Sequence, residues 1–117
     1  MGMQICPEGV VVVELPAEPE TTKELENLMR CVEDQDGCDV VLDFSNVTIL
    51  TSKSLAPMML LKGLLNTYGR RLVMCCINPA TKGVFSVTAL DAAFEIVEDK
   101  AAALALVEPH AEKSDSP

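Results

Sequence analysis

Aromatic and basic residues are scarce in this sequence. It has no tryptophan, one tyrosine and three phenylalanines in 117 residues, so few aromatic side chains are available to stack on bases or sugar rings. Lys and Arg total 9 against 18 Asp and Glu, and the net charge is −9. An acidic chain lacks the basic footprint that binds nucleic acid, and an anionic membrane surface does not attract it. We therefore expect no nucleic-acid partner.

Signals for export or membrane insertion are also missing. No basic N-terminal segment precedes an apolar stretch and a cleavage site, which a secretion signal requires. No apolar run reaches ~18 residues, the length of a membrane-spanning helix. We expect a soluble, cytoplasmic protein with no direct membrane insertion.

The five cysteines do not form a recognisable metal or redox motif. An odd number without a secretion signal indicates free thiols, and there is no C-x-x-C pair. The single histidine, His110, lies near the C-terminal end, so we expect no zinc site and no bound metal. Cys75 and Cys76 lie in an apolar strand, where adjacent side chains face opposite ways, and we interpret them as small buried apolar residues.

The common catalytic motifs are absent as well. The sequence has no G-x-G-x-x-G, no Walker loop and no G-x-S-x-G elbow, and His110 is poorly placed to act as a base. We expect no cofactor and no enzymatic activity.

Strand-like and helix-like segments alternate along the chain. Continuous β-branched or apolar runs predict buried strands, and apolar residues at helical spacing predict helices between them. The order β-α-β-α-β-α-β-α predicts a single α/β domain, residues 1–108, with a central and mostly parallel sheet, followed by a polar, disordered tail, residues 109–117. The expected strands are 10–13, 38–44, 70–77 and 94–98, and the expected helices begin near Thr21, Leu55, Pro79 and Lys100.

Local signals predict where the helices begin and end. Thr21 and Glu24 have the spacing of a capping box, Asn78 and Asp99 precede helices as caps, and Gly69 follows one as a stop. Pro57 is tolerated in the first turn of a helix, which favours Ser54 as the cap of the second helix.

The junction "VTILTSKSLAP" (residues 47–57) is the best candidate for a functional site. It places Thr51, Ser52, Lys53 and Ser54 between a buried strand and an apolar helix, at the carboxyl edge of the sheet where ligands and partners commonly bind. Met58 and Met59 in the next helix suit an adaptable contact surface. The alternative interpretation is that Ser54 or Ser52 merely caps the helix and that most of the helix is core.

The sequence resembles the STAS domain, a family found in sulphate transporters and anti-sigma factor antagonists. The resemblance covers residues 40–107 and, more weakly, the N-terminal strand and helix. It rests on "SNVTIL" before a small polar loop and a helix, on a strand followed by "NP", and on "SVTALDAAFEIVED" (residues 86–99). The last segment is similar to the family's Thr-Gly-Leu-Asp followed by Phe-x-Ile-x-x-Asp.

The resemblance implies a regulatory role in bacterial transcription. In the family the loop commonly reads Asp-Ser-Ser-Gly-Leu-Gly, and in the antagonists a partner kinase phosphorylates a serine there. Aligned without gaps, Lys53 stands at the usual phosphoserine, with Thr51 and Ser52 before it and Ser54 after it. Lysine places +1 where a phosphate would place about −2, so the phosphoswitch is predicted to be altered or lost, with Ser52, Ser54 or Thr51 as the remaining phosphorylation candidates.

The predicted function is therefore a non-enzymatic module for signal transduction by protein–protein interaction. It would dock on an anti-sigma factor or kinase-type partner through Ser45, Asn46, the residues Thr51, Ser52, Lys53 and Ser54, and Met58. A stand-alone STAS subunit bound to a transporter ATPase is the alternative, and a domain that binds a small ligand or nucleotide is a further one. The oligomeric state stays open.

Overall fold

A computed structural model gives the structure of the protein, and it describes residues 2–6, 9–35, 37–87 and 92–107. Five strands form one sheet in the order β1-β2-β3-β4-β5. β1 is antiparallel to β2, and the other neighbours are parallel. The strands are β1 (Gly2–Cys6), β2 (Val10–Glu14), β3 (Asp39–Asp43), β4 (Leu72–Cys75) and β5 (Glu95–Val97).

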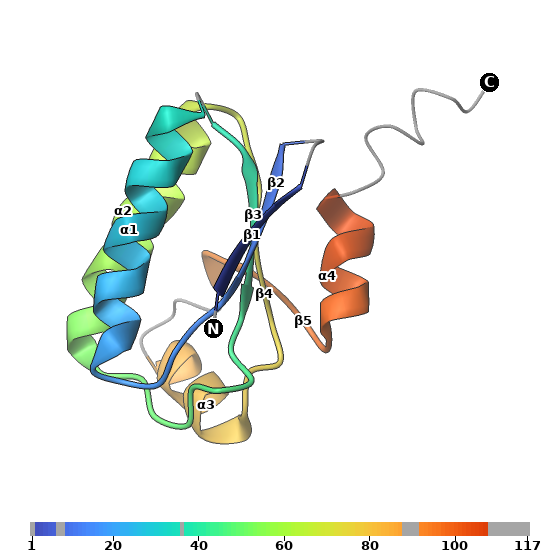
Figure 1. Cartoon of the computed structure of the whole chain (residues 1–117). Coiled ribbons are helices and arrows are strands. Elements are labelled where there is room, and N and C mark those ends of the chain that lie inside the picture. The colour runs from blue at the N-terminus through green and yellow to red at the C-terminus, as the bar shows by residue number, and fades with distance from the viewer. Residues whose placement is uncertain (1, 7–8, 36, 88–91, 108–117) are drawn as a thin grey trace.

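Four helices connect or follow the parallel strands. α1 and α2 pack side by side on one face of the sheet, α4 covers the other face, and α3 lies at one end (Figure 1). Their bounds are α1 (Glu20–Asp34), α2 (Ser52–Thr67), α3 (Pro79–Val87) and α4 (Lys100–Val107). None of the helices in the described ranges is both long and apolar enough to span a bilayer.

The predicted α/β architecture with a mostly parallel sheet is confirmed, with one strand more than expected. β1 pairs with β2 along five register positions at the edge of the sheet, and the sequence interpretation assigned no strand there. The predicted tail, residues 109–117, and His110 lie outside the described residues.

The strands bury side chains on both faces, as continuous apolar runs predict. Val11 and Val13 of β2 belong to the core under α1 and α2, whereas Val10 and Val12 belong to the core under α4. Because each strand contributes alternate residues to two cores, a shift of register by one residue would exchange the two sets.

The ends of the helices confirm some of the local predictions and correct others. Asn78 Oδ1 accepts a hydrogen bond from Thr81 N at 2.8 Å, and Asp99 Oδ1 accepts one from Ala102 N at 2.8 Å, so both predicted caps are confirmed. The prediction of a capping box at Thr21 is wrong. α1 begins at Glu20, so Thr21 lies inside the helix, and its buried hydroxyl donates to the carbonyl of Pro16 at 2.6 Å.

Arg71 joins three elements at the C-terminal part of the domain. Its Nε donates to Glu95 Oε1 in β5 at 3.1 Å, and its Nη1 donates to the carbonyl of Leu106 in α4 at 3.1 Å. The hydrogen bond from Arg71 is the main cause that holds the pKa of Glu95 below its usual value. Both side chains are 40% exposed, so solvent screens much of this attraction.

We expect Glu95→Gln to lower the free energy of unfolding by less than about 1 kcal/mol at pH 7. The folded protein holds the Glu95 proton less tightly than the unfolded chain does. The contribution is therefore complete above the ordinary pKa of 4.5 and is lost as the pH falls through the folded-state pKa. Urea unfolding at a series of pH values from 7 downward measures this: the difference between the two proteins should decrease as the pH falls below 4.5. A difference that does not decrease as the pH falls below 4.5 would contradict the ion pair, and the exposed Glu26→Gln is the control.

Candidate functional site between β3 and α2

The segment from the end of β3 to the start of α2 is fixed at three points. Ser45 N donates to Asp43 Oδ1 at 2.9 Å, immediately after the strand. Asn78 Nδ2, from the start of α3, donates to the carbonyls of Val47 at 3.2 Å and Thr48 at 3.0 Å. The third anchor, at the start of α2, is the carboxylate of Glu18, which lies between β2 and α1.

One oxygen of Glu18 binds the first turn of α2. Glu18 Oε2 accepts hydrogen bonds from Thr51 N at 3.1 Å, Thr51 Oγ1 at 3.0 Å and Ser54 Oγ at 2.8 Å. The Ser54 hydroxyl also lies 2.9 Å from Thr22 Oγ1 in α1. Helix N-termini attract anions because their N–H groups are unpaired and the helix dipole is positive there. A carboxylate of the protein itself therefore occupies the end of α2 where a phosphate would otherwise be favoured.

The predicted cap and the predicted start of α2 are wrong. Thr51 is the N-cap, with extended backbone and without a side-chain hydrogen bond into the helix, and Ser54 lies in the first turn with 0% exposure. Pro57 is buried at the sixth position of α2 instead of in the first turn. Pro57 cannot donate to the carbonyl of Lys53, but Lys53 is exposed, so water can take the place of that bond.

The predicted site residues differ in their accessibility. Ser45, Asn46, Thr51 and Lys53 are exposed, and Ser52 is the first residue of α2. Met58 is fully buried in the core under α1 and α2, which corrects its expected place on the contact surface. The large apolar side chains that α2 exposes are Met59, at 41%, and Leu60, at 64%, and Ile49 before the helix is 69% exposed.

Glu18 is the residue that the sequence interpretation missed. It precedes α1 and lies 33 positions before Thr51, so no local rule for helix caps includes it. The parallel pairing of β2 with β3 brings the loops after these strands to the same edge of the sheet, which is the general signal for such a contact.

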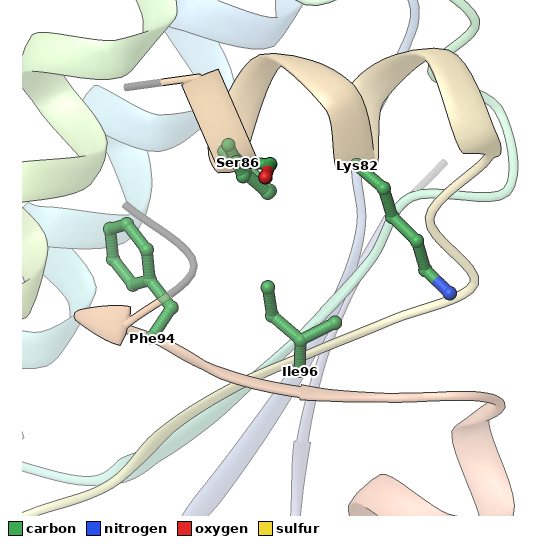
Figure 2. Close-up of a pocket in the computed structure, with 5 residues that line it drawn as sticks. Lys82, Ser86, Phe94 and Ile96 are labelled. Atoms are coloured by element: carbon green, nitrogen blue, oxygen red, sulfur yellow. The ribbon is translucent and has the colours of Figure 1, made fainter. Parts of the chain in front are cut away.

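A hollow of about 430 Å³ lies between α3 and β5 (Figure 2). The residues that line it are Lys82, Phe85, Ser86, Phe94 and Ile96. The described lining residues include no carboxylate, histidine or cysteine. The described lining offers an apolar wall with one ammonium and one hydroxyl.

Solved structures share this fold across nearly their whole length. An anti-sigma-factor antagonist (STAS) domain protein from Planctomyces limnophilus has a TM-score of 0.76 at 17% identity, covering 91% of this chain and 97% of its own. The anti-sigma factor antagonist SpoIIAA, in its unphosphorylated form, has a TM-score of 0.69 at 10% identity, covering 99% and 98%. A serine-to-glutamate variant of RsbS from Moorella thermoacetica has a TM-score of 0.74 at 17% identity, covering 93% and 97%.

These likenesses confirm the predicted STAS-type fold. They rest on structure, since no protein-family model matches the sequence and no curated protein matches it either. At identities of 10 to 17% the comparison establishes the fold and leaves the role of individual residues to be argued from this chain's own geometry.

Proposed function

We propose that this STAS-fold chain is a non-enzymatic regulatory domain of the anti-sigma factor antagonist kind. It docks on an anti-sigma factor or kinase-type partner through the segment from Ser45 to Ser54 and the exposed side of α2. The observation that carries the proposal is the anchored loop: three sets of hydrogen bonds hold an exposed polar segment in one conformation beside exposed apolar side chains. A surface that is ordered before binding loses less entropy on association.

The chemistry of the loop argues against a phosphoswitch of the usual kind. Lys53 stands where the family carries its phosphoserine, and the neighbouring Ser54 hydroxyl is buried and donates to Glu18. A phosphate on Ser54 would place about −2 charge beside that carboxylate, without water to screen the repulsion. We infer that the domain binds its partner without being phosphorylated at Ser54 and that Glu18 holds the loop in its docking conformation.

We expect Lys53→Glu and Leu60→Asp each to reduce partner retention by tenfold or more. Both residues are exposed, so the substitutions change the docking surface without disturbing the core. The measurement is capture from native lysate on the immobilised protein, followed by identification of the retained proteins. Lys23→Glu on α1 and Val87→Asp on α3 make the same changes on exposed parts of other helices and should leave retention unchanged.

The identity and the reaction of the retained partner test the rest of the proposal. A kinase-type anti-sigma factor supports the antagonist role, whereas a transporter ATPase retained through the same residues would indicate the alternative system. Incubation with that partner and ATP should leave the intact mass unchanged. A gain of one phosphate that maps to Ser52, Ser54 or Thr51 would overturn the lost phosphoswitch, and unchanged retention of both variants would place the docking surface elsewhere.

A further inference from the structure

A pair of adjacent cysteines lies at the carboxyl edge of the sheet, on the face opposite to α1 and α2. Cys75 ends β4 and is buried among the residues that pack against α4, and Cys76 is half-buried against the same cluster. The expectation that their side chains face opposite ways is wrong. Cys76 has a φ of 62°, in the left-handed region that residues other than glycine seldom adopt. That conformation ends the strand and leaves both thiols on one side.

Asp43 completes the cluster from the neighbouring strand β3. The Sγ atoms of Cys75 and Cys76 and a carboxylate oxygen of Asp43 all lie within 4.8 Å of one another. The Asp43 side chain is 5% exposed, and its Oδ1 accepts the N–H of Ser45, which orients the carboxylate. Ligands of a tetrahedral zinc ion are separated by about 3.3 to 3.8 Å, given metal–ligand bonds of about 2.0 to 2.3 Å. Small side-chain rotations therefore suffice to bring the three atoms onto one ion.

Lys100, the first residue of α4, balances the charge. Its Nζ lies 3.2 Å from Asp43 Oδ2 and 3.5 Å from Glu14 Oε2, and the side chain is 38% exposed. Two thiolates, one carboxylate and a divalent cation sum to −1, which the ammonium of Lys100 offsets. Because Lys100 also contacts Glu14, it can stay in place while Asp43 turns toward an ion.

We propose that Cys75, Cys76 and Asp43 form a site for a thiophilic divalent cation of the Zn²⁺ class. Two thiolates select a soft or borderline ion over Mg²⁺ or Ca²⁺, which prefer oxygen ligands alone. Binding displaces the two thiol protons to solvent, and a water completes the four ligands. Burial raises the pKa of Cys75 to about 12 in the empty site, so the ion has to compete with a tightly held proton.

The strained backbone conformation of Cys76 is the second observation that supports a metal site here. A left-handed conformation costs about 1 to 3 kcal/mol at a residue other than glycine, and such strain persists where the surrounding structure imposes it. Here the N–H of Cys76 donates to the carbonyl of Glu98 at 3.2 Å, which ties the residue to the segment between β5 and α4. The fold thus holds the second thiol in the position that a chelating pair needs.

The test is metal binding to the full chain in a non-thiol reductant, after removal of metal with a chelator. Addition of Co²⁺ should produce the absorption bands of a tetrahedral thiolate complex at one equivalent, and Zn²⁺ should abolish them. Cys75→Ser and Cys76→Ser should each weaken Zn²⁺ binding by more than about 100-fold, and Asp43→Asn by about tenfold or more. Cys31→Ser, at a half-buried thiol on α1, is the matched control and should bind as the unmodified protein does.

A substitution can weaken Zn²⁺ binding simply by destabilising the fold, so the shift of the thermal unfolding midpoint on addition of Zn²⁺ is measured as well. Zn²⁺ should raise the midpoint of the unmodified protein and of Cys31→Ser, and should leave the midpoint of Cys76→Ser unchanged. Absence of thiolate bands in folded, reduced protein would overturn the proposal, as would Zn²⁺ binding that survives in the double variant Cys75→Ser/Cys76→Ser. None of these outcomes depends on the docking surface at Thr51–Ser54.

Discussion

Ser54→Asp should lower the free energy of unfolding by more than about 3 kcal/mol, although aspartate is the usual substitute for a phosphoserine. Ser54 has 0% exposure, and its hydroxyl lies 2.8 Å from Glu18 Oε2. A carboxylate at that position would be desolvated and would face a second carboxylate within hydrogen-bonding distance. Urea unfolding at pH 7 measures the loss.

The partner of Ser54 provides an internal control for this result. In a Glu18→Gln background the like-charge repulsion is gone, so the cost of Ser54→Asp should fall by at least about 1 kcal/mol. Lys53→Glu introduces an acidic side chain one residue away at an exposed position and should change stability by no more than about 0.5 kcal/mol. If Ser54→Asp is as stable as Lys53→Glu, then Ser54 is not buried against Glu18 in solution.

Phe85→Ala should be the most destabilising truncation in α3, at about 3 to 5 kcal/mol. Phe85 is fully buried, with its ring edge-on to Phe44 at a centroid distance of 6.3 Å and tilted against Phe94 at 6.0 Å. Its removal leaves a cavity between α3 and the sheet and breaks two aromatic contacts. α3 fully buries two residues within its bounds, Thr81 and Phe85, so Phe85 is the one large apolar side chain that it buries completely.

The measurement is again urea unfolding, with Val87→Ala as the control in the same helix. Val87 is 87% exposed, so its truncation removes almost no buried area and should cost no more than about 0.5 kcal/mol. A loss below about 1 kcal/mol for Phe85→Ala would show that the three phenylalanines do not form a packed cluster.

The sequence predicted the fold class well because the relevant signals are local and repeated. Continuous apolar strands, helical spacing and the caps at Asn78 and Asp99 all act within a few residues, and the structure confirms them. β1 was missed although Met3 and Ile5 alternate with polar or small residues and a Pro-Glu-Gly segment follows. Five residues of weak alternation are a small signal, and pairing with β2 supplies the rest of the stabilisation.

The candidate site was less predictable because its contacts come from distant parts of the chain. Ser54 satisfies every local rule for a cap, but a carboxylate 36 positions earlier accepts its hydroxyl, and the helix starts before it. Met58 is expected at the surface because its helix is apolar on nearly all sides. Only the position of α1 shows which side of α2 is buried, and Met58 lies on that side. The left-handed conformation of Cys76 likewise follows no rule of residue type, since it depends on the segment after β5.

The order of the strands in the sheet has a consequence for how the protein is made. Because β1 to β5 lie side by side in chain order, each strand from β2 to β5 pairs with the strand that the ribosome produced just before it. Each parallel pairing closes over a single helix or helical segment, so no pairing has to wait for a more distant strand. The sheet can therefore grow by one strand at a time during synthesis. α4 comes last among the described elements, so the face that holds Cys75 stays open until that helix has been made.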